Sequence, residues 1–325
     1  MVLSVVAVLS ISISSSALEE ENEQELVVVE DAGKYGCYEY DISTPGVITE
    51  TYIPAESTED IQGELFIPAS DNLLEEEPEP YAIIGNDDRK VVTEVKDRFA
   101  STCLIGARFF DGPEGVTKGT GFLINRGHLM TAAHCLCNDN KDMAKHVAVY
   151  VGASGGNRRA YRVGRVYRIG EKYKDTMNSA MAPERACDDW GLLRFDSPLS
   201  DGNKEYPGHL GIYCVNSSSD MQNRTYQTQG YPADKNSRID KWDNWEMYTC
   251  SGTIYPSYGR TQPVVTTSLD ISEGQSGSPV YSYRTSKGYC AEAIISSSST
   301  FPGEETNYLV LINDSLLKKI HAFCD

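Results

Sequence analysis

The sequence predicts an all-β protein: two six-stranded antiparallel β-barrels, an acidic N-terminal segment and a short C-terminal α-helix. From Ile83 onward, short runs rich in Val, Ile, Tyr and Phe alternate with turns rich in Gly, Asn, Asp and Pro, which is typical of all-β chains. These runs fall into two clusters of about six, separated at Ser197-Pro198. Closed barrels would hide the strand edges that an open sheet leaves exposed.

Taken in chain order, the apolar runs give the expected strands and one helix. The first cluster comprises residues 101–110, 119–124, 128–132, 146–151, 161–169 and 191–195. The second cluster comprises residues 209–215, 225–231, 245–254, 264–268, 279–283, 290–296 and 308–312. Asn313 or Asp314 can cap a final helix, whose Leu316, Leu317 and Ile320 share one face. We therefore expect one domain over residues 82–325, with barrels at roughly 82–200 and 201–325.

The chain begins with an apolar segment, residues 2–13, that is too short to span a bilayer. Ser15-Ser16-Ala17 follows, with the small residues that signal peptidase requires. These features predict a signal peptide over residues 1–17 and a soluble, secreted, extracellular protein. The start of the segment lacks Lys and Arg, so a buried apolar N-terminal strand is the alternative.

Residues 18–81 form an acidic segment. The first 80 residues carry 19 Asp and Glu but one basic residue, Lys34, which leaves 28 acidic and 28 basic residues for the remainder. The formal net charge of −18 therefore belongs to the front of the chain. No polybasic run occurs, which argues against nucleic acid or an anionic membrane as partner.

Nine cysteines favour an oxidising compartment, and disulfide bonds are expected there. Because nine is odd, at least one thiol is free or pairs outside the chain, and Cys37 is the one we expect to be left over. Cys135-Leu136-Cys137 has no second cysteine or histidine pair to complete a zinc site, so no metal is expected. Three sequons permit N-glycosylation or go unused: Asn216, Asn223 and Asn313.

Three short stretches carry residues suited to nucleophilic catalysis. They are Leu129–Cys135, which contains His134, Asp188–Phe195, which begins with two aspartates, and Gly274–Val280, which contains Ser276. A serine becomes a nucleophile when a base takes its proton and amide donors await the oxyanion. The order His, Asp, Ser is that of one of the known serine triads.

With these stretches the chain resembles the chymotrypsin-like serine proteases of the trypsin-like clan, and their glutamyl-endopeptidase-type branch in particular. The resemblance covers roughly residues 82–325 and also rests on Ile84-Gly85-Asn86-Asp87-Asp88-Arg89, Gly119–Ile124 and Leu311–Asp314. Related proteases often have a half-cystine at the position of Cys135. Its partner does not follow from the sequence, although Cys103 on the first expected strand is a candidate.

The resemblance implies a role for each matching residue. His134 is the general base and Ser276 the nucleophile, and the N–H groups of Gly274 and Ser276 form the oxyanion hole. Asp189 orients the imidazole; its neighbour Asp188 competes, but the acid in related proteases immediately precedes an inward strand, here Trp190–Leu193.

The specificity pocket is assigned to Asp270 and Ser296. Asp270 lies six residues before Ser276, where trypsin-type enzymes place the carboxylate that selects Arg and Lys. The glutamyl-endopeptidase branch uses a histidine before the last loop instead, and Ala293–Ser299 contains none. The serine run there offers hydroxyls to a substrate or is merely a polar loop.

One position departs from the trypsin pattern in a way that bears on activation. An aspartate precedes the catalytic serine in the trypsin branch and receives the new N-terminal ammonium, whereas this chain has the uncharged Gln275. A mature terminus at Ile83 or Ile84 therefore cannot form that ion pair, and activation must work in another way, such as unblocking of the cleft.

The sequence therefore predicts a secreted serine endopeptidase, made as a zymogen, that acts as a monomer on protein or peptide substrates without a cofactor. The acidic segment is read as a pro-segment that inhibits the enzyme, or else as a solvated tail. A protease-fold binding protein that no longer cleaves is the alternative. An esterase of unrelated fold is disfavoured, because its G-x-S-x-G elbow and Ser-first order are absent.

Overall fold

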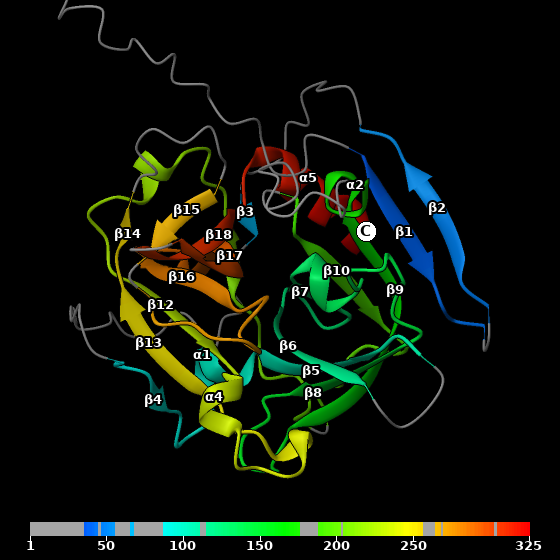
Figure 1. The fold of residues 1–325 in the computed structure, drawn as a ribbon, viewed down its shortest axis with the longest axis horizontal. Helices are drawn as coiled ribbons and strands as arrows, with labels where there is room; N and C mark the ends of the chain where they lie inside the picture. The colour runs from blue at the N-terminus through cyan, green and yellow to red at the C-terminus, as the bar shows by residue number, and fades with distance from the viewer. Residues whose placement is uncertain are drawn as a thin grey trace, which may run out of the picture.

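Figure 1 shows a computed structural model in which two β-sheets lie side by side. The residues that the structure describes are 36–44, 47–55, 66–67, 87–110, 115–175, 188–202, 204–255, 264–267, 269–301 and 304–325. The predicted signal peptide, residues 1–17, lies outside them. The mature terminus considered at Ile83 or Ile84 also lies outside them.

The first sheet contains a closed six-stranded antiparallel barrel. Its strands run in the order β10-β7-β6-β5-β8-β9, and pairing between β9 and β10 closes it. The predicted first barrel is confirmed, with each strand within about three residues of the expected position. The bounds are β5 (Thr102–Arg108), β6 (Val116–Leu123), β7 (His128–Thr131), β8 (His146–Val151), β9 (Ala160–Gly170) and β10 (Gly191–Phe195).

A hairpin from the acidic segment extends this sheet. β1 (Cys37–Asp41) pairs antiparallel with β9, and β2 (Thr49–Ile53) pairs with β1 at the outer edge of the molecule (Figure 1). Tyr40 is 1% exposed, and its ring stacks on Tyr167 with centroids 5.5 Å apart. Because β1 buries Cys37 and Tyr40 and is followed by the buried Ile42, residues 36–44 are packed against the first sheet, whereas the side chains of β2 are largely exposed.

The second sheet has ten strands, ordered β14-β15-β18-β17-β16-β12-β13-β4, with β11 parallel to β17 and β3 on β11. Within the described residues no pairing joins β14 to β4, so closure is seen for the first barrel alone. The expected strand at 245–254 is split into two. The bounds are β3 (Phe66–Ile67), β4 (Lys90–Val91), β11 (Gly211–Tyr213), β12 (Tyr226–Gly230), β13 (Tyr248–Gly252), β14 (Ile254–Tyr255), β15 (Val264–Thr267), β16 (Pro279–Arg284), β17 (Gly288–Phe301) and β18 (Glu304–Leu311).

The helices are short, and the last one was expected from the sequence. They are α1 (Asp97–Ala100), α2 (Glu171–Asp175), α4 (Ala233–Asn236) and α5 (Asp314–Cys324), with 3₁₀ turns η3 (Ala133–Cys135), η4 (Ser218–Met221) and η5 (Trp242–Asn244). The Asn313 side chain caps α5 by accepting a hydrogen bond from the Leu316 amide at 3.0 Å. None of the helices described here is long and apolar enough to cross a membrane.

One apolar cluster spans the two sheets and fixes how they meet. It joins Met130 on β7 and Leu192 on β10 to Ile294 on β17, all fully buried. Each such side chain contributes about 1.5–3 kcal/mol when buried. The ends of β7 and β10 are thereby held against β17.

Candidate active site

His134 lies where β7 ends and the chain turns through η3. Its Nδ1 is 2.8 Å from the Oδ2 atom of Asp189, and its backbone N–H donates to Oδ1 of the same carboxylate at 3.0 Å. The imidazole is 30% exposed, whereas the Asp189 side chain is 5% exposed. A carboxylate on Nδ1 favours the tautomer with its proton there, which leaves Nε2 as the basic nitrogen.

Asp189 is brought to His134 by the pairing of neighbouring strands. It lies two residues before β10, whose Gly191 pairs with Thr131 of β7. Its Oδ2 atom also accepts a hydrogen bond from the Ser296 hydroxyl at 2.6 Å. Three donors from two sheets therefore converge on this buried carboxylate.

Asp188 serves a different set of partners. It is fully buried, and its carboxylate accepts hydrogen bonds from the Trp190 indole at 2.7 Å and from the Lys172 amide at 2.9 Å. These contacts tie the start of β10 to α2. The adjacent aspartates are thus separated by geometry, with Asp189 alone hydrogen-bonded to His134.

Ser276 lies in a tight loop, residues 272–278, that we call the serine loop. Two of its glycines have left-handed backbone conformations. Gly274 has a φ of +89° and Gly277 a φ of +84°, which other residues rarely adopt. A Cβ on Gly277 would lie 2.2 Å from the Thr120 carbonyl oxygen, so no larger residue fits. Ser276 itself is partly exposed. Within the part of the chain that the structure describes, the N–H groups of Gly274 and Ser276 donate to no hydrogen bond, which leaves them available to an oxyanion.

The serine loop packs directly against the first barrel. The Thr120 amide on β6 donates to the Ser276 carbonyl at 2.9 Å, and the Thr120 hydroxyl donates to the Gly274 carbonyl at 2.8 Å. The Cys135 thiol, next to His134, lies 3.6 Å from the same Ser276 carbonyl. The stretches carrying His134, Asp189 and Ser276 therefore meet at one place.

Comparisons with known proteins identify the family. Residues 119–287 match the family described as the trypsin-like peptidase domain. The chain belongs to this family. It is therefore a serine-type endopeptidase, a hydrolase.

A relative and two solved structures resemble this trypsin-like peptidase. Glutamyl endopeptidase of Bacillus licheniformis is 24% identical over 261 residues, which cover 79% of this chain and 69% of the relative. A Glu endopeptidase solved in complex with MPD superimposes with a TM-score of 0.58 at 18% identity, covering 74% of this chain and 99% of its own. Protease Anisep from Arthrobacter nicotinovorans gives 0.54 at 14% identity, covering 72% and 98%. The two structures support the predicted chymotrypsin-like fold.

Both residues assigned to the specificity pocket have their side chains engaged within the peptidase. The Asp270 carboxylate accepts a hydrogen bond from the Asp88 amide at 2.8 Å. The Ser296 hydroxyl is held by Asp189, and the residue is 2% exposed. Their roles in substrate selection stay predictions.

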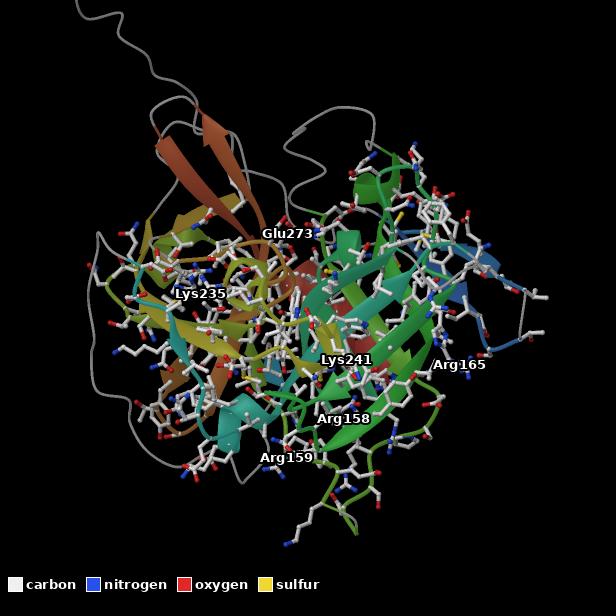
Figure 2. All side chains as sticks on the ribbon, turned by 60° about the horizontal axis from the view of Figure 1, so that its bottom comes forward. Arg158, Arg159, Arg165, Lys235, Lys241 and Glu273 are labelled. Carbon is white, nitrogen blue, oxygen red and sulfur yellow. The ribbon has the colours of Figure 1, made fainter. Side chains whose placement is uncertain are left out.

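A cavity of about 480 Å³ lies beside the serine loop. Its lining includes Lys118, Trp242, Trp245, Glu273 (labelled in Figure 2) and Gly274. Because Gly274 belongs to the serine loop, this cavity is adjacent to the reacting centre. Among the described residues no group of three or more His, Cys, Asp or Glu side chains could hold a metal ion.

Cys135 is not bonded to Cys103, the candidate partner that the sequence offered. Cys103 and Cys135 are both free, as are the other six cysteines that the structure describes. The Cys135 thiol is turned toward the Ser276 carbonyl, and burial raises its pKa to about 12. Cys37, expected to be left over, is free and buried.

The three sequons differ in accessibility. Asn216 and Asn223 are exposed, so both could carry a glycan. Asn313 is 4% exposed and its side-chain oxygen caps α5. A glycan on Asn313 would remove that cap and would need space inside the core, so the structure argues against glycosylation at this site.

The sequence did not identify two residues near the site. Thr120 braces the serine loop, and Arg89 reaches it from the N-terminal side. Both residues lie in stretches that carried the family resemblance, Gly119–Ile124 and Ile84–Arg89. A matching stretch indicates that a residue belongs to a pattern, but it does not say what the side chain contacts.

Proposed function

We propose that this trypsin-like peptidase cleaves peptide bonds through a triad of Ser276, His134 and Asp189 and an acyl-enzyme intermediate. The observation that best supports it is the Asp189 carboxylate, which accepts from His134 Nδ1 at 2.8 Å while the serine loop packs against the His134 turn. Asp188, fully engaged with Trp190 and Lys172, has no part in the chemistry.

In the first half-reaction the Ser276 hydroxyl oxygen attacks the scissile carbonyl carbon and its proton passes to Nε2 of His134. Asp189 stabilises the resulting imidazolium without taking the proton. The N–H groups of Gly274 and Ser276 receive the oxyanion, and each such donor is worth about 3–4 kcal/mol in the transition state. His134 then protonates the leaving amine, which departs and leaves an ester on Ser276.

In the second half-reaction water takes the place of the amine. His134 removes a proton from the water as its oxygen attacks the ester carbonyl, and the same oxyanion hole receives the charge. Collapse of this intermediate releases the carboxylate product and returns the proton to Ser276. The cycle needs no metal or organic cofactor.

The glutamyl preference in the relative's name is not part of the proposal. The stretch Ala293–Ser299, where that branch places a histidine for the substrate carboxylate, contains none. Ser296, which lies within it, donates its hydroxyl to Asp189. The substrate class is therefore proteins and peptides in general.

The proposal also includes secretion and synthesis as an inactive precursor. The mature enzyme acts as a monomer. Residues 1–17 carry the signal and 18–81 the pro-segment, which inhibits the enzyme until it is cut ahead of the domain at 82–325. The docked hairpin supports a pro-segment that touches the enzyme, because Glu39 pairs with Arg168 at 2.6 Å and Lys174 with Glu50 at 2.5 Å.

The test is active-site labelling combined with substitution of the nucleophile. A fluorophosphonate probe should label the wild-type enzyme but not Ser276→Ala, and the variant should lose peptidase activity by several orders of magnitude while it still folds. About 10³-fold acceleration over water should remain, from the oxyanion hole and substrate binding. Near-wild-type turnover by Ser276→Ala would rule out Ser276 as the nucleophile, whereas an unlabelled and inactive wild type would favour a protease-fold binding protein.

A further inference from the structure

A buried cation lies next to the residue that precedes Ser276. The guanidinium of Arg89 is 7% exposed, and its Nη1 donates to the Gln275 side-chain oxygen at 3.3 Å and to the Ser272 hydroxyl at 3.1 Å. Arg89 directly precedes β4, which pairs with β13. Pairing of β4 with β13 at the edge of the second sheet therefore holds the Arg89 guanidinium beside the serine loop.

Two carboxylates hold the guanidinium in place and keep it charged. Asp234 accepts from Nη1 at 3.0 Å and from Nη2 at 2.6 Å, and Asp87 accepts from Nε at 3.0 Å and from Nη2 at 2.9 Å. Burial alone would lower the pKa of Arg89, but the hydrogen bonds to these carboxylates outweigh burial and raise it. Such two-pronged contacts fix the plane of a guanidinium as well as its position.

Gln275 is the element of the serine loop that faces this cation. The residue is fully buried, and its Oε1 also accepts the Ser272 amide at 3.0 Å. Its Nε2 has no hydrogen-bond partner among the described residues, so contacts to Oε1 alone orient the carboxamide. Gln275 stands between Gly274 and Ser276, and its orientation bears directly on the two N–H groups proposed for the oxyanion hole.

Neighbouring segments form further hydrogen bonds to the serine loop and to Asp270 just before it. The Asp88 amide donates to Asp270 at 2.8 Å, and the Ala233 amide next to Asp234 donates to the Glu273 carbonyl at 2.7 Å. Lys235 on α4, labelled in Figure 2, pairs with Asp87 at 2.5 Å. Residues 87–89 and α4 thus enclose the loop from one side.

We propose that Arg89 is a positioning residue, an internal cation that orders the 272–276 loop through Gln275 so that the Gly274 and Ser276 amides form the oxyanion hole. Trypsin-type enzymes use a new N-terminal ammonium against an aspartate at the position of Gln275. Here the cation is a side chain within the folded domain and its acceptor is neutral. This role rests on the proposed triad. Because the cation is a side chain, the loop is ordered without any cut that frees a new N-terminal ammonium.

The test compares Arg89→Ala with Arg159→Ala. Arg159 is a matched control. It donates to the Val95 carbonyl, shortly after β4, at 3.4 Å, and within the described residues it makes no hydrogen bond to the serine loop. Arg89→Ala should lower kcat by about 10²-fold, the scale of a lost oxyanion donor, with KM within about threefold. Arg159→Ala should stay within about twofold in both. Ethylguanidinium added to Arg89→Ala should restore part of kcat, which a merely structural role would not produce.

A second variant decides the matter if Arg89→Ala does not fold. Gln275→Met keeps the ion pairs of Arg89 with Asp87 and Asp234 but removes the acceptor that links them to the loop. We expect the same loss in kcat, and no further loss when Arg89→Ala is added wherever the double variant folds. A folded Gln275→Met or Arg89→Ala enzyme with kcat within about threefold of wild type would overturn the proposal, and so would no rescue by ethylguanidinium.

Failure of the positioning role is distinguishable from failure of the proposed function. If fluorophosphonate labels Ser276 in the wild type and Arg89→Ala turns over normally, the triad stands and the role of Arg89 is wrong. If Ser276→Ala is as active as wild type, the triad itself is wrong.

Discussion

The two halves of the site are held in different ways. His134 and Asp189 stand at the ends of adjacent strands, β7 and β10, whose pairing sets their separation. The serine loop belongs to no strand pair, and contacts from distant parts of the chain hold it: Thr120 on β6, the Ile295 carbonyl on β17 and Arg89 before β4. Strand pairing in the first barrel places the proposed base and its acid, whereas contacts from distant segments place the loop of the proposed nucleophile.

This difference shows where control can act. Pairing of β7 with β10 forms when the first barrel folds, and it brings His134 and Asp189 together within the first sheet. The loop needs the second sheet, the N-terminal segment and α4 at once. Changes that affect folding little but activity strongly should therefore concentrate around residues 272–276.

The largest effect on the barrel half should come from Asp189→Asn. We expect a loss of about 10⁴-fold in kcat near neutral pH, because an amide in place of the carboxylate favours the wrong tautomer of His134. Asp188→Asn is the matched control, since its partners are Trp190 and Lys172. It should lower the thermal midpoint with kcat within about tenfold. Equal losses of kcat from the two variants would remove the distinction between the neighbouring carboxylates.

Much of the barrel half was predictable from the sequence, for a physical reason. Strands of alternating or continuous apolar residues bounded by turns identify themselves locally, and His134 and Asp189 each sit within three residues of such a strand. The family resemblance then implied the roles that we propose for them. The order of the motifs implied the proposed role of Ser276 in the same way.

The contacts around the loop were not predictable, because they depend on the three-dimensional arrangement of distant segments. Arg89 and Gln275 are 186 residues apart, and Ser296 and Asp189 are 107 apart. No local pattern indicates that the Ser296 hydroxyl faces a carboxylate instead of a substrate. The partner of Cys135 stayed open for the same reason, since the sequence does not show that its thiol faces the serine loop.

A smaller effect is expected from Ser296→Ala, which removes a contact between β17 of the second sheet and Asp189 before β10 of the first. Its hydroxyl donates to the Asp189 carboxylate at 2.6 Å, and a hydrogen bond to a charged group contributes about 1.5–3 kcal/mol. The two hydrogen bonds from His134 should still hold the Asp189 carboxylate in the variant, so kcat should fall only about tenfold. Ser282→Ala is the control, because its buried hydroxyl also donates to a carboxylate, that of Glu292 at 2.6 Å, and it should change kcat less than twofold. Steady-state kinetics of the purified variants measure this effect. An unchanged kcat in Ser296→Ala would mean that this hydrogen bond does not help to position Asp189.

The smallest effect should come from changing the mature N-terminus, which we expect between Pro80 and Gly85. An ammonium buried beside the neutral Gln275 would lose its hydration without gaining a counter-charge, which costs several kcal/mol, so the loop should not depend on it. Arg89 already occupies the acceptor oxygen of Gln275 at 3.3 Å. The full precursor, given an engineered cleavage site that leaves either the authentic end or one or two extra residues, keeps the β1–β2 hairpin available in both forms. Their kcat values should agree within about threefold. A drop of more than about a hundredfold in the extended form would show that a charged terminus orders the loop after all, with a carboxylate such as Asp270 receiving it in place of the Asp88 amide.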